Sequence, residues 1–395
     1  MFKVTSEILF NKDKENVMQT YGRFPLAVEK GKGVKLWDFE GNEYIDLTTG
    51  IGVTSIGHTN PVWIEAIEGQ IKKLGHISNL YYTEPGTLLA EKITKLSGMK
   101  RVFFANAGGE ANEGLIKLCR KYSSEKYGSG RSTIITLLNS FHGRTITTLA
   151  ATGQDKFHKD FHPFTEGFKY VPADDIDALK NAVTEDVCAV LIECVQGEGG
   201  VMPLDREYIK AVEALCAQKD LLFAIDEVQT GFGRTGTMFA FQKMGVSPDV
   251  VSMAKGIAGG LPLGGFMVNE KCADVLKPGD HATTFGANPV CCAAALAVVG
   301  EIEKCLPEIE KKGEYFRDKL KGLNSPLIKD VRGEGLMIGA VIEGMAPAEL
   351  VKKLIAAGVL ALTAGSDVLR LMPALNITYE EVDEAISKMS AVLAG

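Results

Sequence analysis

The sequence lacks the features that would place the protein in or across a membrane. None of its apolar runs approaches the roughly 18 residues that a membrane-spanning helix needs. Charged residues interrupt the start of the chain (Lys3, Glu7 and Lys12), so no signal peptide is predicted. The eight cysteines form no C-x-x-C pair and most lie in apolar surroundings, which is typical of buried, reduced thiols. These absences predict a cytoplasmic protein with no membrane partner.

An excess of positive charge is also missing. The formal net charge is −7, and nucleic acids select for basic patches, so no nucleic-acid partner is predicted. The histidines and cysteines show none of the spacings that hold a metal ion, so no metal site is predicted either.

The chain is long enough for more than one core, and strand and helix patterns alternate along it. Its 395 residues indicate at least two domains. Buried-strand patterns occur at 101–105, 133–138, 187–192 and 221–225, and helix patterns at 110–121, 176–183 and 208–218. This alternation predicts the α/β class, with a largely parallel or mixed sheet covered by helices on both faces.

The character of the sequence changes after Asn288. Residues 289–304 are typical of a long helix rich in small residues, and a second strand–helix–strand region follows, whose last helix begins at the capping-box sequence Thr378-x-x-Glu381. The start of the chain, with a hairpin turn near 37–43, has no core of its own and is expected to pack on this region. The predicted divisions are an N-terminal segment at 1–48, a large domain at 49–288 and a smaller α+β domain at 289–395.

Two charged residues end predicted buried strands. Asp226 follows the strand at 221–225, and Lys255 follows residues 249–254. Charged residues in this position lie at the sheet edge where open α/β folds bind ligands. For either residue alone a solvated surface charge is the ordinary explanation. Together they suit pyridoxal phosphate, because an acid keeps the ring nitrogen protonated and a buried lysine of lowered pKa attacks the aldehyde.

Two turns after predicted strands could complete such a site. Gly108 and Gly109 precede a helix start whose unpaired N–H groups can bind a phosphate, although the same pattern fits an ordinary strand-to-helix turn. Phe141 can stack on a flat ring, and Arg144 can bind a carboxylate through two hydrogen bonds. A loop with a solvated arginine is the alternative.

One motif indicates a different class of enzyme. Residues 231–236 match G-x-G-x-x-G, which raises the alternative of an NAD-dependent dehydrogenase. That motif should follow its strand at once and open the first βαβ unit. Here residues 227–230 intervene, the unit is late in the sheet and the next strand ends in Lys255, so the dehydrogenase is a remote alternative.

Taken together, these segments resemble the class III aminotransferases, which are fold-type I pyridoxal-phosphate enzymes, and within them the acetylornithine aminotransferases of arginine biosynthesis. The resemblance covers almost the whole chain. Its main segments are FANAGGEANE (104–113), FHGRT (141–145), QGEGG (196–200), DEVQTGFGRTG (226–236), AKG (254–256), TTFG (283–286), VRGEGLM (331–337) and LRLMP (369–373). It implies a large cofactor-binding domain with a mostly parallel mixed sheet, plus a smaller α+β domain built from the two termini.

The resemblance implies a set of cofactor contacts. Lys255 holds the cofactor covalently and moves a proton at the substrate carbon, and Asp226 pairs with the ring nitrogen. The other implied contacts are Gln229 near the ring hydroxyl, Val228 and Phe141 on the ring faces, the N–H groups of Gly108 and Gly109 on the phosphate, and Thr284 of a second subunit, also on the phosphate. A homodimer is therefore expected.

The resemblance also implies a substrate site with two arginines. Arg144 binds a substrate carboxylate, with Thr283 nearby, and Arg370 binds the α-carboxylate of glutamate or 2-oxoglutarate. Glu198 pairs with Arg370 while the other substrate is bound, because a buried arginine without a partner is costly. When the dicarboxylate enters, Glu198 must swing away.

The implied activity is a ping-pong transamination. The terminal amine of N2-acetyl-L-ornithine passes to 2-oxoglutarate, which gives N-acetyl-L-glutamate 5-semialdehyde and L-glutamate. Ornithine, succinylornithine, N-succinyl-LL-diaminopimelate and 4-aminobutyrate stay open as donors, because a few pocket side chains set that choice. The chain departs from the usual family pattern at Ala107 and Gly109 in the phosphate turn and at Thr283, and none of these changes removes a catalytic group.

Overall fold

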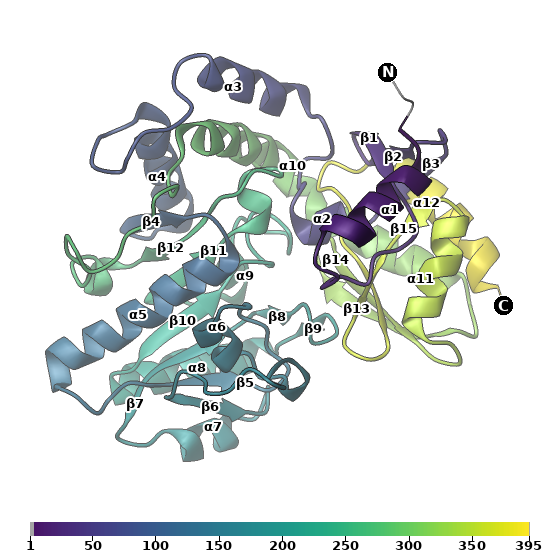
Figure 1. Ribbon diagram of the computed structural model, residues 1–395. Coiled ribbons are helices and arrows are strands. Elements are labelled where there is room, and N and C mark those ends of the chain that lie inside the picture. Colours follow the sequence, from purple (N-terminus) through teal and green to yellow (C-terminus); the bar gives the residue numbers. More distant parts are fainter. Residues whose placement is uncertain (1–3, 395) are drawn as a thin grey trace.

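A central seven-stranded sheet organises the larger part of the protein (Figure 1). The computed structural model describes residues 4–394. The strand order is β4-β12-β11-β10-β7-β5-β6. The strands are β4 (Arg101–Ala105), β5 (Thr133–Leu137), β6 (Phe168–Val171), β7 (Val187–Ile192), β10 (Leu222–Asp226), β11 (Val250–Met253) and β12 (Gly264–Val268). Only β12 runs antiparallel to its neighbours within this sheet, so the predicted mostly parallel mixed sheet is confirmed.

Helices cover both faces of this sheet. They include α3 (Pro61–Ile71), α4 (Glu84–Ser97), α5 (Gly108–Tyr127), α6 (Ile146–Ala151), α7 (Ile176–Ala182), α8 (Arg206–Lys219) and α9 (Ala240–Met244). Along β10, Leu222 and Ala224 share an apolar cluster with α5, whereas Phe223 and Ile225 join the cluster on the other face. Because strand side chains alternate between faces, Asp226 at the end of β10 continues the α5 face.

A smaller sheet is built from the C-terminal part of the chain. Its order is β13-β14-β17-β16. Its strands and helices are β13 (Ile328–Glu334), β14 (Met337–Ile342), β16 (Leu362–Ala364), β17 (Val368–Leu371), α11 (Pro347–Ala356) and α12 (Tyr379–Leu393). The predicted capping box is confirmed, since the Thr378 side chain accepts from the Glu381 N–H at 3.1 Å and the Glu381 carboxylate accepts from the Thr378 N–H at 2.8 Å.

The N-terminal strands join the C-terminal part of the molecule. The strands β1 (Val28–Lys32), β2 (Lys35–Asp38) and β3 (Glu43–Asp46) form an antiparallel meander, and β3 pairs in parallel with β15 (Val359–Leu360). Figure 1 shows these purple strands beside the yellow C-terminal helices. The remaining elements are α1 (Ser6–Asn16), α2 (Thr49–Gly52), β8 (Val195–Gln196) and β9 (Met202–Pro203). The domain limits at residues 48 and 288 stay predictions.

The long helix α10 (Pro289–Gly322) connects the two parts and is longer than the predicted 289–304. A proline inside a helix usually ends or kinks it, but α10 continues through Pro307. Beyond the proline, Ile309, Phe316 and Leu320 are buried in the main core at helical spacing, and their burial favours continuation of the helix. No helix within residues 4–394 is both long and apolar enough to cross a membrane.

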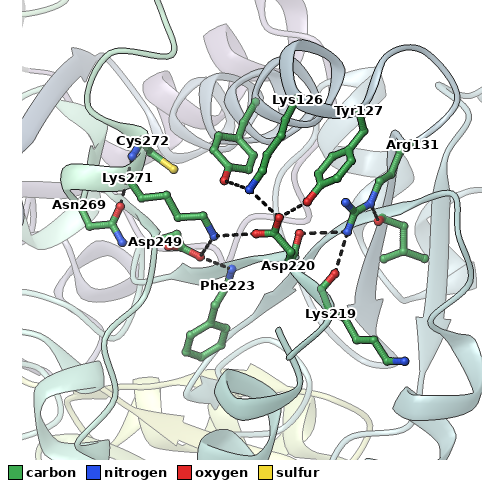
Figure 2. Close-up of polar contacts among 12 residues, drawn as sticks. Lys126, Tyr127, Arg131, Lys219, Asp220, Phe223, Asp249, Asn269, Lys271 and Cys272 are labelled. Carbon is green, nitrogen blue, oxygen red and sulfur yellow. Dashed lines mark hydrogen bonds and ion pairs between the residues drawn. The ribbon is translucent and has the colours of Figure 1, made fainter. Parts of the chain in front are cut away.

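A polar cluster closes the amino-terminal edge of the large sheet, and Figure 2 shows it around Asp220. Asp220 is the C-cap residue of α8, lies in the left-handed region (φ 49°) and precedes the start of β10 by two residues. Its carboxylate accepts from Lys126 at 2.6 Å and from the Tyr127 hydroxyl at the end of α5, and Lys271 lies 3.8 Å away. The Arg131 guanidinium donates to the Asp220 carbonyl at 2.9 Å. One carboxylate therefore ties the end of α5 to the start of β10.

We predict that Asp220→Asn lowers the thermal midpoint by about 1 to 3 °C at low salt, since a partly exposed ion-pair network contributes on the order of 1 kcal/mol. Asparagine keeps the shape and tolerates the left-handed backbone, so the variant isolates the charge. Thermal unfolding at low and high salt measures the effect. Asp177→Asn, which loses an exposed pair with Lys180, is the control; an equal loss in both variants would contradict the prediction.

Candidate active site

Asp226 and Lys255 lie at the carboxyl edge of two adjacent strands. Strands β10 and β11 pair in parallel with Asp226 opposite Ser252, and Lys255 comes two residues after the end of β11. Both residues line one cavity of about 820 Å³. Lys255 opens the short 3-10 helix η2 (Lys255–Ile257) with φ 48°, an uncommon conformation for a lysine. Backbone strain of this kind is concentrated at functional sites.

Three donors hold the Asp226 carboxylate in place. Its Oδ2 accepts from Asn112 Nδ2 at 2.7 Å and from His142 Nδ1 at 2.8 Å, and its Oδ1 accepts from the Val228 N–H at 2.9 Å. Such a set of donors suits an ionised carboxyl group, which only accepts hydrogen bonds. Asn112 and His142 were not predicted as site residues. Knowing that Asp226 faces α5 would have pointed to Asn112, which lies in the second turn of that helix.

The turn before α5 approaches the ring-binding side of the cavity closely. A Cβ at Gly108 would lie 2.7 Å from Val228 Cγ1, so only glycine fits there, whereas a Cβ at Gly109 would have its nearest contact at 3.7 Å. The carboxylate of Glu110 accepts from the Asn106 N–H and from its side chain, each at 2.8 Å. Since Gly108 and Gly109 are the first two residues of α5 and line the cavity, their N–H groups have no partner within the helix.

Phe141, Arg144 and Val228 also line the cavity. The Arg144 guanidinium lies over the ring of Phe157, 4.1 Å from its centroid, and 5.5 Å from that of Phe141. No carboxylate within residues 4–394 forms an ion pair with Arg144. Within the described residues, the hydrogen-bond donors of its guanidinium group are therefore not occupied by a carboxylate.

Arg370 reaches the site through two cavity residues. It is 2% exposed and lies on β17. Its Nη1 donates to Glu198 Oε1 at 2.6 Å and to Gln229 Oε1 at 3.2 Å, and Gln229 Nε2 donates to Glu198 at 3.2 Å. Glu198 and Gln229 line the cavity. The structure thus brings together three residues that the sequence separates by up to 172 positions.

The charges around Lys255 are linked. Burial lowers the pKa of Lys255, and the Arg370 cation acts in the same direction while Glu198 opposes it. Burial alone would raise the pKa of Glu198, but the cation of Arg370 and its hydrogen bond lower that pKa overall. Burial and the Glu198–Arg370 pair therefore act together on the pKa of the Lys255 amine.

Glu193 is a further acid that the sequence did not single out. It directly follows β7, and the preceding residue Ile192 pairs with Ile225, so Glu193 lies beside Asp226 in register. Its carboxyl group accepts from the Phe141 N–H at 3.0 Å. Burial, with the neighbouring Asp226 charge, raises the pKa of Glu193 well above its ordinary value. Glu193 therefore sits in the cavity wall as an acid whose protonated form is favoured relative to an exposed glutamate.

Thr283 and Thr284 lie apart from the other predicted residues. Neither lines the cavity. Thr283 Oγ1 accepts from Asn106 Nδ2 at 3.0 Å, so it contacts a residue that lines the cavity. Thr284 is exposed. The chain on its own therefore does not bring Thr284 to its own cavity.

The residues around the cavity fit pyridoxal phosphate. They offer an acid for the ring nitrogen, an amine for the aldehyde, a helix start for the phosphate, and Val228 and Phe141 as apolar neighbours for the ring. The glycine at 108, where a Cβ would clash, leaves the helix start accessible beside Val228. No group of metal-binding side chains occurs in the part of the chain that the structure describes.

The G-x-G-x-x-G motif does not form a nucleotide site. Residues 231–236 make turns, the next helix starts only at Ala240, and none of the six lines the cavity. A dinucleotide-binding turn would open a helix directly after its strand. The dehydrogenase alternative therefore has no structural support at this motif.

Comparison with known proteins agrees with this geometry. The family described as aminotransferase class-III matches residues 17–393. The acetylornithine aminotransferase of Haemophilus ducreyi is 51% identical over 99% of this chain and 100% of its own length, and that of Methanocaldococcus jannaschii is 47% identical over 96% of each. The solved ornithine aminotransferase from Toxoplasma gondii superposes with a TM-score of 0.95 at 33% identity, covering 99% of this chain and 95% of that one.

An acetylornithine aminotransferase structure from Elizabethkingia anophelis covers 99% of both chains with a TM-score of 0.88 at 32% identity. Sequence and structure agree over nearly the full length. The chain therefore belongs to the class III aminotransferases, and pyridoxal phosphate is its cofactor.

Proposed function

We propose that the protein transfers the terminal amino group of N2-acetyl-L-ornithine to 2-oxoglutarate, giving N-acetyl-L-glutamate 5-semialdehyde and L-glutamate. The observation that carries the proposal is the ion pair of Glu198 and Arg370 at the cavity that Lys255 lines. Arg370 Nη1 and Glu198 Oε1 are 2.6 Å apart. The choice of donor rests on relatives named acetylornithine aminotransferase that are 43–51% identical. Ornithine is the second candidate donor, because the solved neighbours include ornithine aminotransferases.

Two residues, Lys255 and Asp226, act at the reacting end of the substrate. Pyridoxal phosphate, when bound, supplies an aldehyde that takes up the amino group and a ring that accepts electrons from the breaking C–H bond. The lowered pKa of Lys255 makes its amine a nucleophile and then a base that moves a proton at the substrate carbon. Asp226, oriented by Asn112 and His142, pairs with the ring nitrogen.

The two arginines select the two substrates in turn. The donor reacts through a terminal amine with no carboxylate beside it, so Arg370 keeps Glu198 as its partner and Arg144 binds the distant carboxylate. Glutamate and 2-oxoglutarate carry a carboxylate next to the reacting carbon, which replaces Glu198 at Arg370. An arginine that is only 2% exposed needs an anion in both states, and this exchange provides one.

We also propose that the working unit is a homodimer whose partner supplies Thr284 to the phosphate. Large apolar side chains are exposed before α4 and beside Thr284: Leu80 is 86% exposed, Tyr82 is fully exposed and Phe285 is 60% exposed. An apolar surface of this kind is characteristic of subunit interfaces. A second copy covering it would bring Thr284 into the interface.

We expect Glu198→Ala to shift the reaction toward α-amino donors. Without Glu198, Arg370 has no competing anion, so the kcat/KM for glutamate relative to acetylornithine should rise by roughly tenfold or more, since a hydrogen bond between charged groups contributes on the order of 1.5–3 kcal/mol. Single-turnover half-reactions with each donor measure the ratio. Glu198→Gln should give a smaller shift; an unchanged ratio in both variants would remove Glu198 as the switch.

The contribution of Thr284 from the partner subunit can be tested by combining two defective variants in one dimer. Lys255→Ala should lower turnover by roughly 10³-fold or more, and Thr284→Ala should weaken cofactor binding by roughly tenfold. In a mixed dimer of the two variants, one site receives Lys255 from one chain and Thr284 from the other, so this site should regain wild-type cofactor affinity. Equilibrium dialysis of purified mixed dimers measures it. Affinity no better than that of Thr284→Ala alone would exclude a contribution from the partner.

A further inference from the structure

The motif at residues 231–236 joins the two parts of the molecule. Arg234 within it is 2% exposed, and its Nη1 donates to the carbonyls of Leu336 at 3.0 Å and Pro373 at 2.6 Å. In return, the Leu336 N–H donates to the Arg234 carbonyl at 3.0 Å. Within residues 4–394 the guanidinium contacts no carboxylate. A buried cation bound only to carbonyls is costly, which indicates a role other than charge pairing.

The two carbonyls lie just beyond the ends of β17, which carries Arg370, and of its neighbour β14. Leu336 directly precedes β14, and Pro373 follows β17 by two residues. These strands pair antiparallel with Gly339 opposite Arg370. Since β17 starts where β14 ends, the start of β14 and the end of β17 lie side by side. One guanidinium thus holds together the two strand ends next to Arg370.

The fit between the motif and the smaller sheet leaves no spare room. Gly335 has φ 52°, and a Cβ there would lie 2.6 Å from the Arg234 carbonyl oxygen. A Cβ at Gly313 on α10 would lie 1.9 Å from the Gly335 carbonyl oxygen. The Arg317 guanidinium donates to that same carbonyl at 3.0 Å. The β13–β14 turn is therefore packed closely against both Arg234 and α10.

The segment 226–236, which contains the motif, also forms part of the cavity wall. Asp226, Val228 and Gln229 line it, and Gln229 accepts from Arg370 at 3.2 Å. Arg234 follows Gln229 by five residues. The segment thus contacts Arg370 directly through Gln229, and fixes the strand of Arg370 through Arg234.

We propose that Arg234 is a positioning residue that sets Arg370 against Glu198 and Gln229, and so determines how tightly the site binds the α-carboxylate of the acceptor. The inference rests on the proposed role of Arg370. Arginine suits the position because both bonds come from Nη1, whose two N–H groups have fixed directions in the guanidinium plane, whereas the rotating ammonium of lysine imposes less geometric constraint. A shift of about 1 Å in Arg370 is enough to weaken a carboxylate site strongly.

The test is calorimetric binding of 2-oxoglutarate to the pyridoxal form of the holoenzyme, with which it does not react. We expect its Kd to rise by about tenfold in Arg234→Met and by a smaller factor in Arg234→Lys. The rate of the single-turnover reaction with acetylornithine should stay within about threefold, because that donor does not use Arg370. Equal losses in both measurements, or no change in Kd, would overturn the proposal.

Two further variants separate the possible explanations. Lys243→Met removes partly exposed contacts with Glu310 and Glu334 and a hydrogen bond to the Thr235 carbonyl at 3.3 Å, next to the same turn but without a contact to the Leu336 or Pro373 carbonyl. It should lower the thermal midpoint and leave the Kd for 2-oxoglutarate within about threefold; a rise like that of Arg234→Met would mean general loosening and overturn the proposal. Arg370→Lys should weaken 2-oxoglutarate binding by itself. If it does not, the proposed role of Arg370 fails, whatever the Arg234 variants do.

Discussion

The pairing of β10 with β11 is the constraint on which the rest of the site depends. Two parallel strands in register place Asp226 and Lys255 at one edge of one sheet, and the alternation of side chains along β10 turns Asp226 toward α5. There Asn112 and His142 hold it from two further segments. Since the first turn of α5 also forms the phosphate turn, one helix positions both the acid and the predicted phosphate site.

The site also depends on the contact between the two parts of the molecule at Arg370. The large sheet supplies an amine, an acid and an apolar slot, which many reactions on amino acids could use. The smaller sheet adds the buried cation of Arg370, and Glu198 and Gln229 receive it at the cavity wall. Because Glu198 is the only anion paired with Arg370 in the part of the chain that the structure describes, its displacement is the physical basis that we propose for binding two different substrates at one site.

The large sheet and much of the site could be predicted from the sequence. Buried apolar runs identified β4, β5, β7 and β10 within a few residues, and a charge at the end of a run identified Asp226 and Lys255. Strand β12 was not predicted, because its two initial glycines have little strand propensity. Glu193, Asn112 and His142 were not assigned to the site, because their importance arises from the pairing of β7 with β10 and the packing of α5 on β10, which connect residues far apart in sequence. The pairing of Glu198 with Arg370 was predicted only from the resemblance to the family. Local sequence patterns do not predict a contact between residues that are 172 positions apart.

The most direct test is a half-reaction panel on the purified holoenzyme, followed by the loss of absorbance of the bound cofactor as amino donors are added. The account predicts that N2-acetyl-L-ornithine reacts with a kcat/KM at least about tenfold above those of ornithine and 4-aminobutyrate, and that 2-oxoglutarate then restores the original spectrum. No reaction with any terminal-amine donor, or restoration by pyruvate but not by 2-oxoglutarate, would contradict it.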